Sequence, residues 1–277
     1  MSDGHLSVCA TPIGNLSDVS DRLKQVLDEA DVVYAEDTRR TSKLLNHVGA
    51  KPKLRSLFAG NEIERSAELL ADVANGLSVA LVSDAGMPTV SDPGAEAIRQ
   101  VRSAGLSVEV IPGPSAVTTA VTASGFSADR FVFEGFLPRK GRSRKERIAS
   151  ISGEERTVVL FASPRRLGDD LADLLTNLDG DRQVSVAREL TKLHEEVWVG
   201  SLSDAVGRWS GDIRGEITLV IEGGGPVVVA AEDAIQQAVD LVNAGMSRSD
   251  AARQTAQTTR VSKRVIYQAL LGNQESS

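Results

Sequence analysis

The chain has 277 residues, a length that suits about two domains. Its 41 % hydrophobic and 25 % charged residues are ordinary for a globular protein, and a net charge of −7 argues against a protein that coats nucleic acid indiscriminately. No apolar run approaches the roughly 18 residues of a membrane-spanning helix. The N-terminus lacks the basic and apolar regions of a signal peptide, so we expect a cytoplasmic protein without membrane contact.

Cysteine and histidine are too sparse for a disulfide framework or a zinc site. Cys9 is the only cysteine and lies in an apolar, strand-like run, which fits a reducing compartment. The histidines His5, His47 and His194 have no metal-ligand spacing, so the sequence predicts no metal site.

Residues 1–125 alternate short β-like runs with helical patterns. Strands are expected at residues 6–10, 32–35, 79–82 and 108–111. Helices are expected at residues 23–30, near 62–75 and 94–104, and from Ser115, whose side chain suits an N-cap. This alternation predicts an α/β domain with a mainly parallel sheet.

Residues 126–225 contain more strands per helix, which predicts a second α/β domain with a mixed sheet. FVFEGFLP (131–138) opens this domain, and GGGP (223–226) resembles a linker after it. Residues 230–277 then read as a small helical unit, in which Ser247 and Asp250 match a capping box and Ser262 starts a last helix. Two short capped helices with basic residues resemble a helix-turn-helix, and a helical hairpin packed on the rest of the protein is the alternative.

Four loops follow the carboxyl ends of the strands expected in the first domain, and in open α/β sheets such loops converge on one crevice. They are ATPIGNLSD (10–18), AEDTRRTSK (35–43), SDAGMPTVSDPG (83–94) and PGPSA (112–116). These loops contain no dinucleotide fingerprint, no P-loop and no nucleophile elbow. They also lack a histidine that would activate a serine, which argues against serine hydrolase chemistry.

Asp84 and Asp92 are the carboxylates of the third loop. Acidic residues are too thinly spread here for an all-carboxylate metal site. Asp84 directly follows a buried strand, so we expect it to contact a ligand. Asp92 precedes Pro93 at a helix start, and we expect it to cap the turn or the helix.

Seven strings in one order resemble the small-subunit ribosomal RNA methyltransferase I family of the tetrapyrrole methylase superfamily, over about residues 6–222. They are TPIGNLSDVSDR, AEDTRRTSKLL, NE (61–62), ALVSDAGMPTVSDPG, IPGPSA, FEGFLPRKGRSR and RELTKLHEE. The resemblance implies two α/β domains with S-adenosylmethionine in the cleft between them. It also implies a homodimer that methylates the ribose 2′-hydroxyl of a cytidine in 16S ribosomal RNA, within the 30S subunit.

The resemblance also implies where the cofactor and the RNA are bound. The cofactor residues would be Pro12, Ile13, Gly14, Asp84, Ala85, Gly86, Met87, Ser115, Ala116, Phe161, Ala187 and Leu190. A mostly apolar slot with a few directed polar groups and small residues suits adenine and ribose, and needs no phosphate cradle.

Arg39, Glu62, Glu189 and Lys192 are the residues that we expect on the RNA side of the cleft, where a base or a cation assists the ribose hydroxyl. A simple pairing of Glu189 with Lys192 on a loop is the alternative for those two residues.

PRKGRSRKER (138–147) carries six basic side chains against one acidic side chain. It is expected to form a mobile loop over the cleft and to bind the RNA backbone through Arg139, Lys140, Arg142, Arg144 and Lys145. The alternative is a solvated basic surface.

Three other functions remain open at this point. A tetrapyrrole methyltransferase would share the cofactor cleft, but its acidic substrate would not require the two basic segments at residues 138–147 and 246–272. Diphthine synthesis, with a protein substrate, is a further relative. A non-enzymatic RNA-binding assembly factor would tolerate loss of the cofactor loops, which are intact here.

Overall fold

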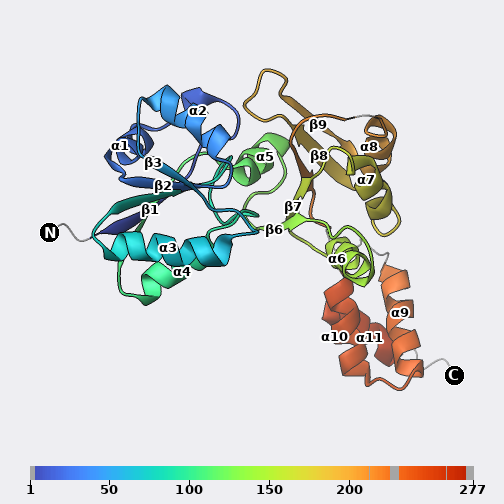
Figure 1. Cartoon of the computed structure of the whole chain (residues 1–277). Coiled ribbons are helices and arrows are strands. Elements are labelled where there is room, and N and C mark those ends of the chain that lie inside the picture. Colours follow the sequence, from blue (N-terminus) through green and yellow to red (C-terminus); the bar gives the residue numbers. More distant parts are fainter. Residues whose placement is uncertain (1–3, 212, 225–230, 260, 273–277) are drawn as a thin grey trace.

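The protein is built from two five-stranded sheets followed by a group of helices (Figure 1). The computed structural model describes residues 4–211, 213–224, 231–259 and 261–272. The predicted fold class, two α/β domains followed by a small helical unit, is confirmed. Part of the expected GGGP linker and both ends of the expected helical unit lie outside the described residues.

The first sheet is entirely parallel, with the strand order β3-β2-β4-β1-β5. Its central strands are buried on both faces, which explains why they are nearly continuous apolar runs. The strands are β1 (His5–Cys9), β2 (Val32–Ala35), β3 (Lys53–Ser56), β4 (Ser78–Val82) and β5 (Ser107–Ile111).

Two helices cover each face of this sheet. Leucines of α1 and α2 pack on one face, and apolar residues of α3 and α4 pack on the other. The helices are α1 (Asp21–Glu29), α2 (Thr38–Val48), α3 (Glu62–Ala74) and α4 (Ala95–Ser103), and a short 3-10 turn, η1 (Leu16–Asp18), precedes α1.

Helix α2 and strand β3 are absent from the elements that the sequence predicted. The first turn of α2 reads TRRTS and has no apolar residue, so its helical period is hidden. Strand β3 has only four residues, KLRS, and lies at the edge of the sheet, where alternation is too short to recognise.

The second sheet is mixed, as predicted, with the order β6-β7-β10-β8-β9. Only β6 and β7 run parallel, and the remaining pairs are antiparallel. Its strands are β6 (Phe131–Phe136), β7 (Thr157–Ala162), β8 (Gln183–Arg188), β9 (Glu196–Ser201) and β10 (Ile217–Ile221).

Alternate residues of this sheet serve two different cores. Val158 and Leu160 of β7 face a core formed with α6 (Arg142–Ser152), α7 (Leu167–Leu175) and α8 (Leu202–Arg208). Val159, between them, faces the opposite side and packs with α5 (Ala116–Ser124). The period of two along the strand therefore separates the helical layer from the face that meets the first domain.

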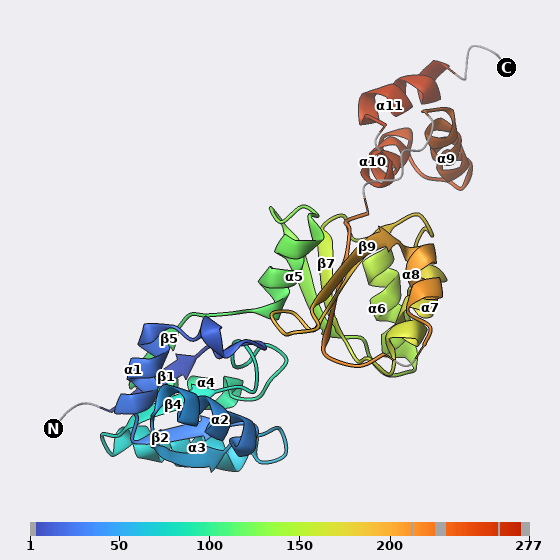
Figure 2. The same cartoon turned by 90° about the horizontal axis from the view of Figure 1, so that it is seen from above.

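Helix α5 packs against the second sheet and not the first. Its residues Val117, Ala120 and Val121 share a core with Val159 and Val220 of that sheet. Figure 2 shows α5 beside β7, joined to the first domain by one extended segment. The boundary expected after residue 125 leaves this helix with the first domain, because chain order alone carries no information on which sheet a helix covers.

Three helices form the C-terminal unit, which lies on the far side of the second domain from the first (Figure 2). They are α9 (Ala231–Asn243), α10 (Arg248–Thr258) and α11 (Lys263–Gly272), around a small core that includes Ala238, Ala252 and Ile266. The predicted cap at Ser247 is confirmed, since its hydroxyl accepts a hydrogen bond from the Asp250 amide at 3.2 Å.

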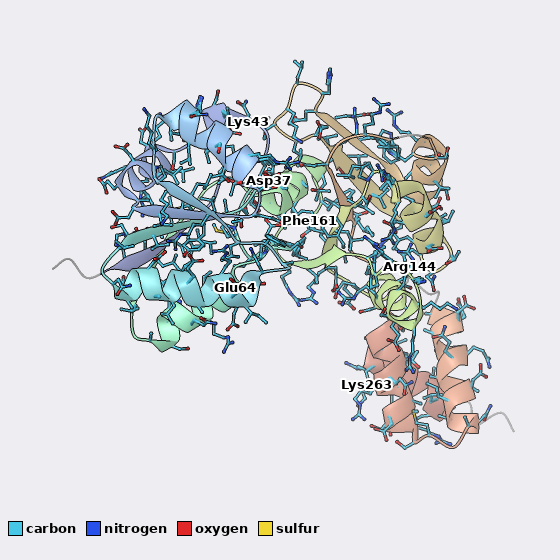
Figure 3. The ribbon with its side chains drawn as sticks, viewed as in Figure 1. Asp37, Lys43, Glu64, Arg144, Phe161 and Lys263 are labelled. Carbon is cyan, nitrogen blue, oxygen red and sulfur yellow. The ribbon has the colours of Figure 1, made fainter. Side chains whose placement is uncertain are left out.

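The basic tract is expected to be a loop, and that prediction is wrong for residues 142–147, which are helical. Residues 142–152 form α6, whose apolar residues Ile148 and Ile151 enter the second-domain core. Arg144 points inward from this helix and pairs with Asp170 at 2.8 Å and Asp173 at 2.7 Å (Figure 3). Its guanidinium also donates to the Pro138 carbonyl oxygen at 3.0 Å. The Arg144 guanidinium is therefore occupied by contacts inside the protein and does not point toward RNA.

Replacement of Arg144 by Ala should destabilise the second domain by about 3 kcal/mol, because the buried Asp170 carboxylate loses its partner. Urea unfolding followed by tryptophan fluorescence measures this, since both tryptophans, Trp198 and Trp209, lie in the second domain. Arg142→Ala is the matched control on the same helix. Its side chain is 90 % exposed, so the midpoint should shift by less than about 0.5 kcal/mol. Equal effects of both variants would contradict a structural role for Arg144.

Candidate functional site

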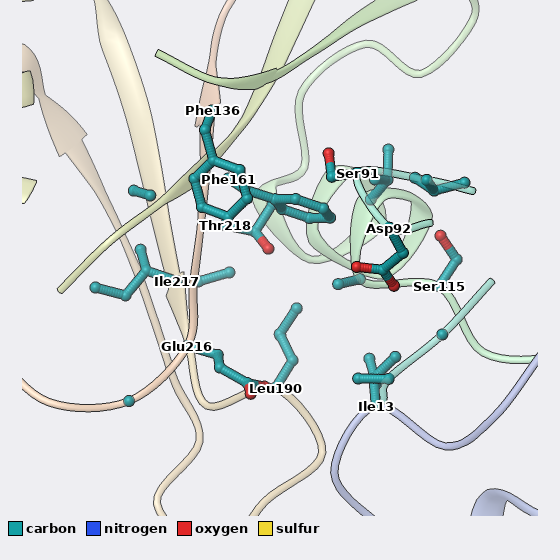
Figure 4. Close-up of a pocket in the computed structure, with 18 of the residues that line it drawn as sticks. Ile13, Ser91, Asp92, Ser115, Phe136, Phe161, Leu190, Glu216, Ile217 and Thr218 are labelled. Carbon is teal, nitrogen blue, oxygen red and sulfur yellow. The ribbon is translucent and has the colours of Figure 1, made fainter. Parts of the chain in front are cut away.

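A cavity of about 390 Å³ lies between the two domains, at the carboxyl ends of the first-domain strands. Its wall is mostly apolar, with a few hydroxyl and carboxylate groups (Figure 4). The lining residues are Ile13, Ala85, Gly86, Met87, Val90, Ser91, Asp92, Ser115, Ala116, Val117, Phe136, Phe161, Ala162, Ser163, Pro164, Ala187, Leu190, Gly215, Glu216, Ile217 and Thr218.

The first-domain wall is held in place by hydrogen bonds between two strand-end loops. Thr11 and Gly86 exchange backbone hydrogen bonds at 2.9 and 3.1 Å, which fixes the loop after β4 beside the loop after β1. The Ser83 hydroxyl also donates to the Gly86 carbonyl oxygen at 3.1 Å. The backbone at Gly86, with a φ of 80°, therefore reaches the cavity in a fixed position.

The second-domain wall is built on aromatic and small side chains. Phe161 stacks edge-on against Phe133 with ring centroids 4.9 Å apart, and Phe136 tilts over it at 5.6 Å. Ala187 and Leu190 continue this wall from the end of β8. The result is an apolar, largely aromatic surface that suits an aromatic ligand.

Most of the residues expected to bind the cofactor do line this cavity, although no ligand is present to test their role. They are Ile13, Ala85, Gly86, Met87, Ser115, Ala116, Phe161, Ala187 and Leu190. Pro12, Gly14 and Asp84 lie outside the lining. Ser115 occupies the N-cap position of α5 as expected, but its side chain makes no capping hydrogen bond and instead faces the cavity.

Gly14 and Asp84 hold the domains and loops together instead. A side chain on Gly14 would place its Cβ 2.5 Å from Lys192 Cγ and 2.9 Å from the Leu190 carbonyl oxygen. Only glycine permits the first loop to approach the second domain this closely. Asp84 accepts a hydrogen bond from the Asp37 amide at 2.9 Å, so it organises the start of α2.

Asp92 is a functional candidate that sequence reasoning assigned to the wrong role. Gly94, with a φ of 118°, occupies the N-cap position of α4. The capping carboxylate comes from Glu62, which accepts a hydrogen bond from the Gly94 amide at 2.8 Å. Asp92 faces the cavity. Sequence alone does not distinguish the two carboxylates, because Glu62 comes from a helix 32 residues away.

The residues at the amino end of β10 are a second set that sequence reasoning missed. Gly215, Glu216, Ile217 and Thr218 line the cavity although they start a strand and do not follow one. The rule that ligands bind at carboxyl ends of strands applies to parallel sheets. Strand β10 is antiparallel to β7 and β8, so its amino end lies at the same edge as their carboxyl ends.

A chain of ion pairs crosses from one domain to the other beside the cavity. Arg40 of α2 lies 3.6 Å from Asp84 and 3.7 Å from Glu216 of the second domain. Lys192 then pairs with Glu216 at 2.9 Å and with Glu189 at 2.8 Å. The alternative expected for Glu189 and Lys192, a mutual pair on a loop, is therefore observed, and it lies at the cavity edge.

Hydrogen bonds keep Glu189 and Lys192 of this ion-pair network charged. The hydrogen bond from Lys192 lowers the pKa of Glu189. Burial disfavours the charged form of Lys192, but its hydrogen bonds to Glu189 and Glu216 outweigh burial and raise its pKa. Both side chains are therefore held in their charged forms.

Glu62 and Arg39 do not reach the cavity. Glu62 is engaged by the backbone of α4, as described above. Arg39 is largely exposed and pairs with Asp37 at 3.1 Å, a contact that raises the pKa of Arg39 through the side-chain hydrogen bond. A place for Arg39 on the RNA side of the cleft stays a prediction. The hydrogen bonds of Glu62 give that residue a structural role.

The described residues show neither a metal-binding cluster nor a membrane-spanning helix. Within the part of the chain that the structure describes, no group of three or more His, Cys, Asp or Glu residues is placed to hold a metal ion. None of the described helices is long and apolar enough to cross a membrane.

The chain is similar in sequence and in fold to known methyltransferases. The model of the tetrapyrrole (corrin/porphyrin) methylases matches residues 5–206. Ribosomal RNA small subunit methyltransferase I of Synechocystis sp. is 42 % identical over 272 residues, covering 97 % of this chain and 98 % of the relative. The chain belongs to the ribosomal RNA small subunit methyltransferase I family, within the tetrapyrrole methylases. The Mycobacterium tuberculosis protein of the same name is 44 % identical over 274 residues, covering 98 % of this chain and 96 % of the relative.

Solved structures support the same fold. Uroporphyrin-III-C-methyltransferase of Thermus thermophilus superposes with a TM-score of 0.58 at 22 % identity, covering 79 % of this chain and 94 % of that chain. At this identity the likeness concerns the fold alone. The protein is thus a methyltransferase of the small-subunit ribosomal RNA family on the tetrapyrrole methylase fold.

Lys192→Met should destabilise the second domain by about 1 kcal/mol at pH 7, because Glu189 and Glu216 lose the cation between them. The pKa of Glu189 is depressed in the folded protein, so this contribution is present above the unfolded value of about 4.3 and is lost as the pH falls through the folded value. Urea midpoints of the variant and the wild type should therefore converge in acid. Lys43→Met, at an exposed position of α2, is the control, and a pH-independent difference would contradict this account.

Proposed function

We propose that this protein transfers the methyl group of S-adenosylmethionine to the ribose 2′-hydroxyl of a cytidine in 16S ribosomal RNA. The observation that carries the proposal is the apolar cavity between the domains, in a chain that is 42 to 44 % identical to relatives named for small-subunit ribosomal RNA methylation. The cavity would hold the methyl donor, and the RNA would approach from its open side.

The residues of the cavity fit this donor. Its volume of about 390 Å³ lies in the range of small-molecule sites. Phe161, Ala187 and Leu190 offer an apolar surface for the adenine and ribose, and the Gly86 backbone permits close approach on the opposite side. The Ser115 hydroxyl supplies a polar group that an amino-acid end or a hydroxyl requires.

S-adenosylmethionine supplies a methyl group on a positively charged sulfur. The protein's tasks are to align the ribose oxygen with that methyl group and to exclude water. The two domains meet around the cavity and are joined by the close contact at Gly14 and the ion pairs of Arg40. Such a joint holds both walls of the site at a fixed separation.

The basic tract is the surface that we propose for the RNA backbone. Arg139, Lys140, Arg142 and Lys145 are exposed, and the tract begins two residues after Phe136, which lines the cavity. Arg144 is excluded from this surface by its internal ion pairs. The proposal extends to a homodimer that acts on the 30S subunit in the cytoplasm, and this part rests on the family resemblance.

A tetrapyrrole substrate is the weaker alternative. The solved tetrapyrrole methyltransferases share the fold at 19 to 22 % identity, whereas the ribosomal RNA relatives share about twice that identity over nearly the whole chain.

The test is to incubate the protein with S-adenosylmethionine labelled in its methyl group and with 30S subunits that lack the modification. Nuclease digestion should then release the label as a 2′-O-methylated cytidine. Ala116→Leu should lower the affinity for S-adenosylmethionine at least about 10-fold, because a leucine at this lining position occupies the cavity. Isothermal titration measures the affinity.

Ala123→Leu is the matched control on the same helix, since Ala123 is exposed, and its affinity should stay within about twofold of wild type. Label on a base, or label on a tetrapyrrole but not on RNA, would overturn the proposed reaction. Equal binding by both leucine variants would place the donor outside this cavity.

Charge reversal at Arg139 and Lys140 should weaken RNA binding and reduce the slope of log affinity against log salt by about 1 to 2, because two phosphate contacts are lost. Filter binding to 16S RNA fragments at several salt concentrations measures this slope. Lys51→Glu with Lys53→Glu, exposed residues around the start of β3, is the control of equal charge. A loss that is the same in both double variants would assign the effect to net charge and not to this surface.

A further inference from the structure

Asp92 stands in an unusual position for a carboxylate. Only two charged side chains, Asp92 and Glu216, line the cavity among the residues that the structure describes. Glu216 is held by Lys192 at 2.9 Å and Arg40 at 3.7 Å, so its charge is already balanced. No lysine or arginine of the described chain forms an ion pair with Asp92. The cavity thus contains one carboxylate without a cationic partner.

The backbone turns Asp92 into the cavity at an energetic cost. Thr89 and Ser91, on the same loop, adopt left-handed φ values of 74° and 66°, which are unfavourable for residues with a Cβ. Figure 4 shows the Asp92 carboxylate directed into the cavity from the first-domain side, near Ser115 and opposite the wall that carries Phe161. This orientation is unnecessary for the helix that follows, because Glu62 caps α4.

We propose that Asp92 is the general base that accepts the proton of the attacking ribose hydroxyl. This inference rests on the proposed function, since it assigns a residue to that reaction. A carboxylate on the cavity wall, free of a cation and next to the space left for donor and acceptor, is placed to take this proton. Neither Arg39 nor Glu62 is placed in the cavity, and Glu189 and Lys192 neutralise each other.

The proton and electron balance of the step is complete. The hydroxyl O–H bond breaks as the new O–C bond forms, and the Asp92 carboxylate takes the proton. The S–C bond breaks with its electron pair left on sulfur, so the donor's positive charge disappears. Asp92 returns the proton to solvent, and no other reactant is required.

The surroundings of Asp92 raise its pKa into the range that suits a general base. Burial raises the pKa of Asp92 to about 6, the Ser83 hydroxyl opposes this shift, and the neighbouring charge of Asp84 adds to it. The pKa of Glu36, which directly follows β2, is raised by burial and then by the charges of Asp92 and Asp84. Arg40 offsets part of this negative charge for Glu36, and Glu216 with Lys192 faces the cavity from the second domain. A base with a pKa just below the working pH is mostly ionised and still a useful proton acceptor.

The experiment compares wild type with Asp92→Asn, Asp92→Glu and Asp84→Asn. Asp92→Asn should lower kcat for ribose methylation about 100-fold while the Kd for S-adenosylmethionine stays within about threefold of wild type. Wild-type kcat should fall as the pH drops through about 6, and this acid limb should be absent in Asp92→Asn. Asp92→Glu should recover part of kcat and keep an acid limb. Asp84→Asn should move the acid limb to lower pH, because it removes a like charge.

A second readout requires no turnover. Carboxyl ¹³C NMR of the protein labelled at aspartate should show one aspartate that titrates near pH 6, and this signal should be missing in Asp92→Asn. A parallel loss of cofactor affinity and kcat in Asp92→Asn would overturn the proposal and make Asp92 a cofactor ligand. Unchanged kcat and an unchanged acid limb would overturn it outright. Failure of the wild type to label ribose would instead contradict the proposed function.

Discussion

The close contact between the loop after β1 and the loop after β8 is the constraint on which the site depends. Gly14 lets the first-domain backbone reach the turn at Leu190 and Lys192, and Arg40 bridges from Asp84 to Glu216 in the same region. Without this joint the two walls of the cavity would be carried by separate bodies. Domain interfaces ordinarily permit motion, so the close fit at Gly14 and the ion pairs of Arg40 act together to hold the two walls.

The charges at this joint are also arranged so that one carboxylate stays unpaired. Glu189, Lys192, Glu216, Arg40 and Asp84 form a continuous chain in which each cation touches two carboxylates. Asp92 lies next to this chain and outside it. A half-buried carboxylate without a cation is destabilising in most places. It therefore indicates a functional demand at a position where the rest of the loop is also strained.

Regular elements with apolar periodicity were predictable, and polar ones were not. The strand expected at 32–35 matches β2 residue for residue, and the one expected at 79–82 lies within β4, because buried strands are short apolar runs. Helix α6 begins with RSRKER, a stretch that reads as a solvated loop, and is helical because Ile148 and Ile151 further along anchor it to the core. Burial of Arg144 on that helix follows from Asp170 on α7, which no local pattern reveals.

The sequence by itself determined the family, the two-domain α/β fold and most of the cavity's first-domain wall, because these are encoded in contiguous strings at strand ends. Only the tertiary structure decided which carboxylate caps α4, which one faces the cavity, and on which sheet α5 packs. It also brought the amino end of β10 to the site, through the antiparallel order of the second sheet. The physical reason is the same in each case: the deciding partner comes from a distant part of the chain, and side-chain chemistry depends on that partner more than on the neighbours in sequence.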